Sequence, residues 1–143
     1  MKDRFRFRIW NGAEMHYNDF VVTSTGYVGK ITEEFLGQCV FRQDDLTSDN
    51  ESILMQSTGL GDKNERLVYE GDIVKAYYIN ADTNKQEFDL MKVVYNEKVC
   101  AFGLQGLNTS GFSDFSSYEW EPDEYEIIGN IHENTELLEV KNA

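Results

Sequence analysis

Residues 53–79 constrain the fold of this chain more than any other stretch of its sequence. Apolar, β-branched and aromatic runs alternate there with clusters of Gly, Asp and Asn, which is the pattern of strands joined by turns. The strands are expected at 53–55, 67–69 and 73–79, and the turns at 58–64 and 70–72. The stretch therefore predicts a β structure whose strongest strand is 73–79, because β-branched and aromatic residues favour strands.

The first of these turns contains a pattern that partly resembles a calcium loop. Asp62 and Asn64 fit the start of such a loop, which needs oxygen ligands at alternate positions, but Arg66 places a cation where a ligand belongs. Acidic turn residues usually accept hydrogen bonds from their own backbone, and Asn tolerates the left-handed conformation of tight turns. We therefore expect Asp62 and Asp72 to be structural, and Asn64 to adopt the left-handed conformation.

Strands and turns alternate along the rest of the chain. The further strands are expected at 20–22, 27–31, 85–96, 99–104 and 127–131, with a loop at 105–117 and a short helix at 136–139. This pattern predicts an all-β, mainly antiparallel fold, a small barrel or sandwich with a short C-terminal helix. The length of 143 residues and the single proline predict one domain over 1–143. The residues expected to be buried are Phe5, Phe7, Ile73, Val74, Ile127 and Ile131.

Charge is unevenly distributed in this acidic chain. Lys2, Arg4, Arg6 and Arg8 against Asp3 give +3 over residues 1–8, and the net charge of −13 leaves −16 on the remainder. Side chains alternate faces along a strand, so the pattern predicts Phe5, Phe7 and Ile9 facing inward and three arginines facing outward.

The arginine row Arg4, Arg6 and Arg8 is a candidate interaction surface. It is either a solvated strand face, whose ion pairs are worth roughly 0–1 kcal/mol, or a surface that meets acidic groups of this chain or of another subunit. The second interpretation predicts salt-sensitive self-association. A nucleic-acid arm is disfavoured, because the acidic remainder repels phosphate.

Residues of catalytic or ligand-binding type do not form a recognisable constellation in the sequence. His16 and His132 stand far apart, and the pair His132 and Glu133 is more typical of surface polarity than of a base with its orienting partner. The acidic run Glu119–Glu126 is expected to bind Ca²⁺ or Mg²⁺ weakly, if at all. We therefore expect no catalytic residues, no cofactor and no metal, and thus no enzymatic activity.

The two cysteines and the apolar runs bear on the compartment. Cys39 and Cys100 have no metal-type spacing, and we expect two reduced, buried thiols in a cytoplasmic protein. No apolar run reaches membrane-spanning length, and the N-terminus is not of the secretory type. The chain is therefore expected in the cytoplasm, away from the membrane.

Motifs spread over the chain lie at residues 4–11, 14–17, 54–60 with 62–64, 69–74, and 125–134 with 136–138. Together these stretches resemble the YopX family, small proteins encoded by phages and prophages of Gram-positive bacteria. Glu65 departs from the family pattern where a turn Gly is usual, and Asn11 departs where Asp is usual. The resemblance implies a small, mainly β protein of phage origin, and it implies no activity, cofactor or catalytic residue.

Residues and resemblance together predict an accessory phage or prophage protein that acts as a non-enzymatic protein-interaction module. The expected partner is a second copy of the chain or a protein of the host or phage, without direct nucleic-acid binding. Two alternatives remain open. The first is an acidic mimic of nucleic acid that occupies a host DNA-binding protein, which would need a dense stripe of carboxylates. The second is a small enzyme of nucleotide or nucleic-acid metabolism, which would need a pocket with converging polar groups.

Overall fold

The structure is a computed structural model, and it describes residues 5–18, 20–22, 28–30, 33–35, 38–40, 46–47, 53–107, 111–115 and 124–139. The chain divides into two compact units. The larger unit comprises Met1–Arg6 and Gln56–Ala143, and the smaller unit comprises Phe7–Met55. The expectation of one domain over 1–143 is a statement about independent folding, and it stays a prediction.

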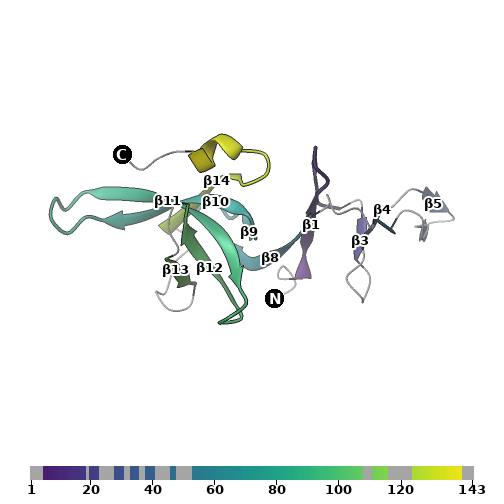
Figure 1. The fold of residues 1–143 in the computed structure, drawn as a ribbon, viewed down its shortest axis with the longest axis horizontal. Helices are drawn as coiled ribbons and strands as arrows, with labels where there is room; N and C mark the ends of the chain where they lie inside the picture. Colours follow the sequence, from purple (N-terminus) through teal and green to yellow (C-terminus); the bar gives the residue numbers. More distant parts are fainter. Residues whose placement is uncertain are drawn as a thin grey trace. The chain divides into compact units, whose positions relative to one another are not determined.

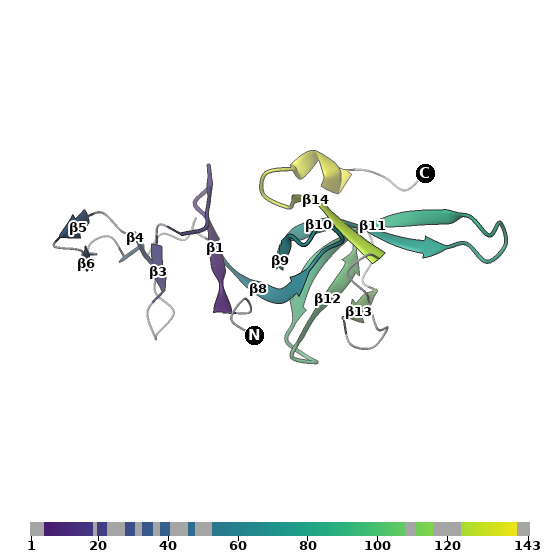
Figure 2. The same ribbon diagram turned by 180° about the vertical axis from the view of Figure 1, so that it is seen from behind.

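A five-stranded antiparallel sheet forms the larger unit, with the strand order β13-β12-β11-β10-β14. The strands are β10 (Asp72–Ile79), β11 (Gln86–Asn96), β12 (Ala101–Gly106), β13 (Phe112–Asp114) and β14 (Tyr125–Asn130). The sheet curls into a half-barrel (Figure 1). Seen from behind, β14 lies beside β10, to which it is paired (Figure 2).

The inner face of this sheet carries the core. Val74 on β10 lies opposite Met91 on β11 and Ile127 on β14, so apolar side chains line the same face of three neighbouring strands. The core cluster consists of Val68, Val74, Ala76, Val93, Leu104, Tyr125 and Ile127, with Met91 and Phe115 packed against it. The predicted burial of Ile73, Val74 and Ile127 is confirmed.

Two further elements complete the larger unit. The second part of β8 (Ile53–Gly61) pairs with β9 (Leu67–Tyr69), with a register shift between Ser57 and Gly61. The 3-10 turn η4 (Thr135–Glu139) follows β14 and corresponds to the predicted short C-terminal helix. The all-β, mainly antiparallel fold with a short C-terminal helical turn is therefore confirmed.

The smaller unit contains short strands. β1 (Phe7–Trp10) pairs with β2 (Met15–His16) and neighbours β8 in the sheet order. A three-stranded sheet joins β3 (Phe20–Val22), β4 (Val28–Lys30) and β7 (Leu46–Thr47), and β5 (Glu33–Phe35) pairs with β6 (Gln38–Val40). Asn11 stabilises the β1–β2 turn, because its side-chain oxygen accepts hydrogen bonds from the backbone N–H of Ala13 and Glu14.

The N-terminal strand does not present the faces that its sequence predicts. Arg8 is buried, with 2% of its surface exposed, whereas Phe5 is 61% exposed and Phe7 is half-buried. The prediction of buried Phe5 and Phe7 beneath an outward Arg8 is therefore wrong. Ile9 is buried as predicted, so both faces of the strand are covered at Arg8 and Ile9, which alternation alone does not indicate. Ile131 was also predicted to be buried and is half-buried.

Candidate functional site

A buried carboxylate joins the β8–β9 turn to the last strand. Asp62 is 1% exposed, and one of its oxygens, Oδ1, accepts hydrogen bonds from the backbone N–H of Asn64 and Arg66, each at 2.9 Å. The other oxygen, Oδ2, accepts the backbone N–H of Ile127 in β14, also at 2.9 Å. All of these donors are backbone groups, which makes Asp62 a structural residue and confirms the prediction for this turn.

Asp72 has a similar role in the next turn. It is buried, and its Oδ2 accepts the backbone N–H of Tyr69 at 2.8 Å. The backbone N–H of Gly71 donates to the carbonyl of Val93, and Gly71 itself has a φ of 87°, a conformation that favours glycine. The two acidic turn residues thus fix the β8–β9–β10 connection.

The left-handed position in the first turn belongs to Glu65. Its φ is 62°, whereas Asn64, for which this conformation was predicted, has no positive φ. The prediction for Asn64 is therefore wrong by one residue. Glu65 is exposed and its backbone N–H donates to the Asp62 carbonyl, so the turn geometry imposes the conformation. A residue with a side chain adopts it at a cost of roughly 1–2 kcal/mol.

Replacing this side chain by hydrogen should stabilise the larger unit. We expect Glu65→Gly to raise the free energy of unfolding by about 0.5–1 kcal/mol, because the relief of the left-handed strain exceeds the extra entropy of glycine in the unfolded chain. Urea denaturation followed by circular dichroism measures the change. Glu97→Gly is the matched control, because Glu97 is an exposed turn residue without a positive φ and its replacement should not stabilise. Equal effects of both substitutions would contradict the explanation.

The β10–β11 hairpin extends beyond the strands that flank it. In the described residues, β14 pairs with β10 as far as Ala76, and β12 pairs with β11 as far as Met91. Beyond these points β10 and β11 pair with each other, and both views show this ribbon projecting from the sheet (Figures 1 and 2). We call residues 77–90 the arm.

A turn with several hydrogen bonds closes the arm. The side-chain oxygen of Asn80 accepts the backbone N–H of Asp82 at 2.9 Å and of Thr83 at 3.3 Å. The backbone N–H of Asn80 donates to the carbonyl of Lys85, and Asn84 takes a φ of 55°. Asn is one of the few residues with a side chain that adopts this conformation readily, so the local sequence specifies the turn.

One face of the hairpin combines aromatic rings with ammonium groups. Paired residues of antiparallel strands share a face, and the register pairs Lys75 with Leu90, Tyr77 with Phe88 and Ile79 with Gln86. We call Tyr77, Ile79, Phe88 and Leu90, together with Lys75 at the base of the arm, the arm face. The rings of Tyr77 and Phe88 meet edge to face with centroids 6.0 Å apart, and Lys75 Nζ lies 4.6 Å from the centre of the Phe88 ring.

A second lysine and a carboxylate border the arm face. Lys63 Nζ lies 5.1 Å from the centre of the Tyr77 ring and 3.6 Å from Glu126 Oε2. The Tyr77 hydroxyl donates a hydrogen bond to the same oxygen at 3.0 Å. This hydrogen bond is the largest cause that raises the pKa of Tyr77 above its ordinary value of 10.0, followed by desolvation and by the charge of Glu126. Each cause disfavours the phenolate.

The hydrogen bond to Glu126 gives a prediction for tyrosine titration. We expect Glu126→Gln to lower the pKa of Tyr77, because a neutral amide neither repels the phenolate nor accepts the phenolic proton as strongly. Ultraviolet titration of tyrosinate, with the Tyr77→Phe variant to assign the change, measures it. Glu87→Gln is the control, because Glu87 accepts the hydroxyl of Tyr78 instead and should alter the titration of that residue. An unchanged Tyr77 titration in Glu126→Gln would contradict the assignment.

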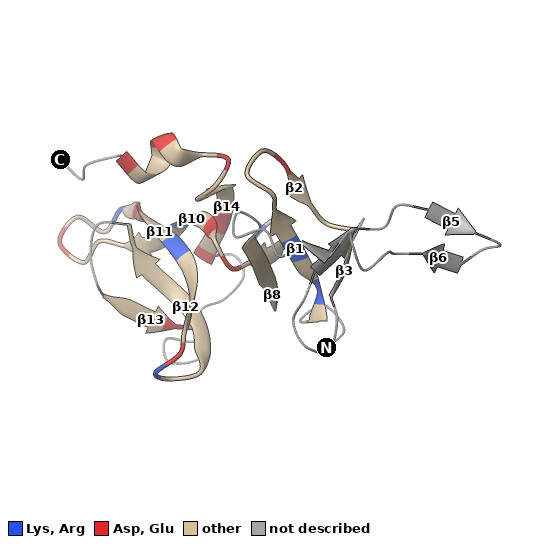
Figure 3. Cartoon of the chain, turned by 45° about the vertical axis from the view of Figure 1, so that its right-hand side comes forward, with Lys and Arg blue, Asp and Glu red and all other residues tan. Residues whose placement is uncertain are grey.

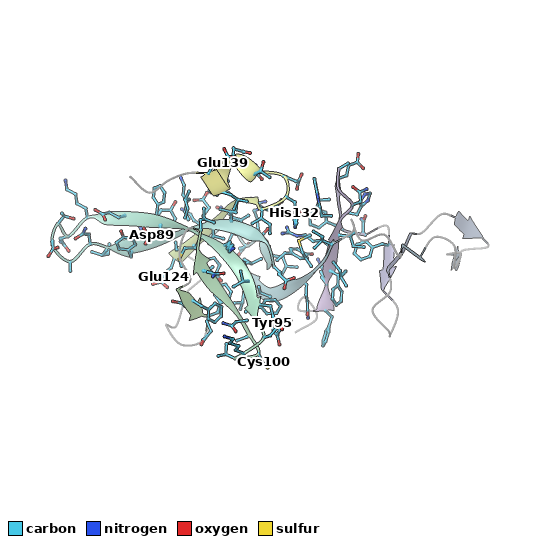
Figure 4. All side chains as sticks on the ribbon, in the orientation of Figure 1. Asp89, Tyr95, Cys100, Glu124, His132 and Glu139 are labelled. Carbon is cyan, nitrogen blue, oxygen red and sulfur yellow. The ribbon has the colours of Figure 1, made fainter. Side chains whose placement is uncertain are left out.

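The residues that the sequence analysis considered for chemistry lie on separate elements. Figure 4 shows Cys100 at the end of the β11–β12 turn, far from His132, which precedes η4. His16 lies in β2, where its Nε2 is 3.0 Å from the side-chain nitrogen of Asn11 and 3.8 Å from Glu14. Cys100 is exposed, so its predicted burial is wrong, and the side chain of Cys39 lies outside the described part.

Two predicted features lie partly outside the described residues. Arg4 belongs to the undescribed N-terminus, whereas Arg6 is exposed and Arg8 is buried, so the three arginines do not form the outward row that was predicted. Of the acidic run Glu119–Glu126, residues 124–126 are described. Within the described ranges, His, Cys, Asp and Glu side chains do not gather in groups of three or more that could hold a metal ion.

The structure also shows what the sequence analysis missed. The arm face went unrecognised, although the alternation of Lys75, Tyr77 and Ile79 with Ala76 and Tyr78 was a usable signal for a strand with one basic, aromatic face.

Among the described residues, no helix has the length and apolar character to span a membrane.

Fold and turn geometry define a small antiparallel β protein with structural acidic turns. Residues 6–139 match the family described as YopX protein, so the chain belongs to the YopX family. It is 27% identical over 141 residues to the SPbeta prophage-derived uncharacterized protein YopX of Bacillus subtilis (strain 168). The match covers 93% of this chain and 95% of that protein.

A solved structure is also similar. The crystal structure of protein EF1440 from Enterococcus faecalis superposes with a TM-score of 0.56 at 25% sequence identity, and the match covers 94% of this chain and 97% of the other. The family resemblance that the sequence motifs indicated is thus confirmed.

Proposed function

We propose that this YopX-family chain is a prophage-encoded accessory protein that works in the bacterial cytoplasm by binding another protein, without catalysing a reaction. The observation that carries the proposal is the exposure of large apolar side chains on the arm, where Ile79 is 60% and Phe88 46% exposed. Neighbouring exposed apolar residues rimmed by polar ones are typical of interaction surfaces. The prophage origin of the Bacillus subtilis relative supports the proposed setting.

The buried acidic groups support the same proposal. Catalytic acids and bases need a free lone pair or proton directed at a substrate. Asp62 instead directs its oxygens at backbone N–H groups of its own chain, and Asp72 does the same for Tyr69. The hydrogen bonds of these two carboxylates to the backbone therefore explain their burial.

Affinity capture tests the proposal. The tagged full chain is expressed in phage-infected bacteria, and captured proteins are identified by mass spectrometry against a tag-only control. The expected result is a defined protein that binds the purified chain in a saturable titration. Failure of every captured protein to bind the purified chain, together with turnover of a nucleotide in a substrate screen, would replace the proposal by the enzymatic alternative.

The acidic nucleic-acid mimic is the second candidate, and the net charge of −13 favours it. Figure 3 marks acidic positions in red on the helical turn η4, whose sequence carries Glu136 and Glu139 without a basic residue in its last turn. A mimic competes with the nucleic acid for its partner. If the captured protein binds DNA, duplex DNA should displace it from this chain, and simultaneous binding of both would reject the mimic.

A further inference from the structure

We propose that the arm face is the docking surface for an acidic protein segment that carries carboxylates beside apolar side chains. This inference rests on the proposed function and specifies its surface and the chemistry of its partner. The arm face is formed by Lys75, Tyr77, Ile79, Phe88 and Leu90 on the outer side of the β10–β11 hairpin.

The first argument is the position of the arm. An isolated two-stranded hairpin is marginally stable in water, and three or more strands or a packed layer are normally needed. In the described part of the chain, the arm lacks a third strand beyond Ala76 and Met91. Ile79 and Phe88 on its outer side nevertheless stay exposed, so a covering segment would stabilise it.

The second argument is the order already present on the arm face. The edge-to-face contact of Tyr77 with Phe88 and the position of Lys75 over the Phe88 ring hold these side chains in one arrangement. Binding to residues already held in place costs less side-chain entropy than binding to freely rotating ones. A pre-arranged aromatic surface with a lysine at its edge is therefore suited to binding.

The third argument is charge. Lys63 is paired with Glu126, and Lys75, which lies opposite Glu126 in the β10–β14 register, contacts the Phe88 ring, so two ammonium groups accompany one carboxylate at the arm face. An ammonium group beside exposed apolar surface attracts a carboxylate, and the local charge stands out in a chain of net charge −13. Charge complementarity thus selects an acidic partner.

The edge of the arm disfavours a second copy of the chain as the partner. Glu87 and Asp89 lie on the face opposite to the arm face, and antiparallel pairing of two β11 edges about Phe88 would place Glu87 of one copy opposite Asp89 of the other. Like charges directly opposite each other destabilise a strand pair. Figure 4 shows Asp89 on β11 within the arm.

Single-stranded nucleic acid is also disfavoured. Bases bind proteins by stacking on the faces of aromatic rings. Lys75 lies over one face of Phe88 and Lys63 over one face of Tyr77, while the net charge of −13 repels phosphates. The face therefore fits carboxylates among apolar side chains better than a phosphate backbone.

Binding of defined probes to the full chain tests the proposal. The probes are a fluorescent synthetic peptide in which glutamate alternates with leucine and phenylalanine, the same peptide with lysine in place of glutamate, and oligo-dT. Fluorescence anisotropy should show binding of the acidic peptide above that of the other two, and binding that weakens with added salt. Amide signals of Tyr77 and Phe88 should shift in NMR spectra.

Matched variants locate the site. Lys75→Glu should weaken binding of the acidic peptide by about fivefold, the size expected for an exposed charge pair, and Phe88→Ser should weaken it further. Lys98→Glu makes the same charge change at an exposed turn, and Tyr78→Ser removes an exposed aromatic ring from the opposite face, so neither should change the affinity.

Several outcomes would overturn the docking surface. With the probes, these are the absence of peptide binding, equal binding of the acidic and basic peptides, or a preference for oligo-dT. With the variants, it is an equal effect of Lys75→Glu and Lys98→Glu on affinity. In sedimentation, it is self-association that Phe88→Ser abolishes. The proposed function fails separately, when no captured protein binds the purified chain. A captured partner that binds wild type and Lys75→Glu equally would leave the function standing and reject this surface.

Discussion

Asp62→Ala is expected to lower the free energy of unfolding of the larger unit by about 3 kcal/mol or more. The alanine side chain accepts no hydrogen bond, so the backbone N–H groups of Asn64, Arg66 and Ile127 lose their acceptor; the bond to Ile127 is buried and the other two are partly buried. Each buried donor left unsatisfied costs roughly 1–3 kcal/mol, and partial entry of water reduces the sum. Urea denaturation followed by circular dichroism measures the loss.

Two further variants separate this explanation from a general effect of losing an acidic residue. Asp82→Ala removes an exposed turn carboxylate and should change stability by less than about 0.5 kcal/mol. Asp62→Asn keeps an acceptor oxygen and should fall between wild type and Asp62→Ala. Equal losses for Asp62→Ala and Asp82→Ala would show that the hydrogen bonds to Asp62 contribute little.

Gly103→Ala is expected to destabilise the same unit by about 3 kcal/mol. A Cβ atom at this position would overlap the carbonyl oxygen of Ser113 and lie 2.7 Å from both Asp114 Cα and Phe112 Cε2. Two of these three atoms belong to the backbone of β13, which pairs with β12 at this point, so the strand itself must move. Overpacking of this kind typically costs 1–3 kcal/mol.

Gly61→Ala is the matched control for this substitution. Its Cβ would meet its nearest neighbour, Glu65 Cα, at 3.6 Å, which is an ordinary contact distance. The alanine should therefore be tolerated, or should stabilise slightly through the lower entropy of the unfolded chain. Thermal unfolding followed by circular dichroism compares the two. A Gly103→Ala variant as stable as Gly61→Ala would mean that β13 adjusts without cost.

The strand pattern was predictable where one local signal dominated. Ile73, Val74 and Ile127 are buried as their apolar, β-branched runs predict, and Asp62 bonds backbone groups as acidic turn residues do. These inferences depend on neighbouring residues alone, and the local sequence contains the information.

Long-range neighbours decided the features that the sequence analysis missed. Alternation separates Phe5 and Phe7 from Arg8, but it does not show that the rest of the chain covers both faces of the strand at Arg8 and Ile9. The arm face likewise depends on where β14 and β12 stop pairing, at Ala76 and Met91. The sequences of β10 and β11 do not indicate where the pairing with their neighbouring strands ends.

The bond from Ile127 to Asp62 links residues that are 65 positions apart in the chain. During synthesis, the β8–β9 turn therefore emerges from the ribosome well before the strand that completes its hydrogen bonding, and β14 also supplies one neighbour of β10. Contacts between such distant positions form late, because chain closure must precede them. The larger unit can complete its fold only after β14 has been made, which leaves the nascent β10 edge open until then.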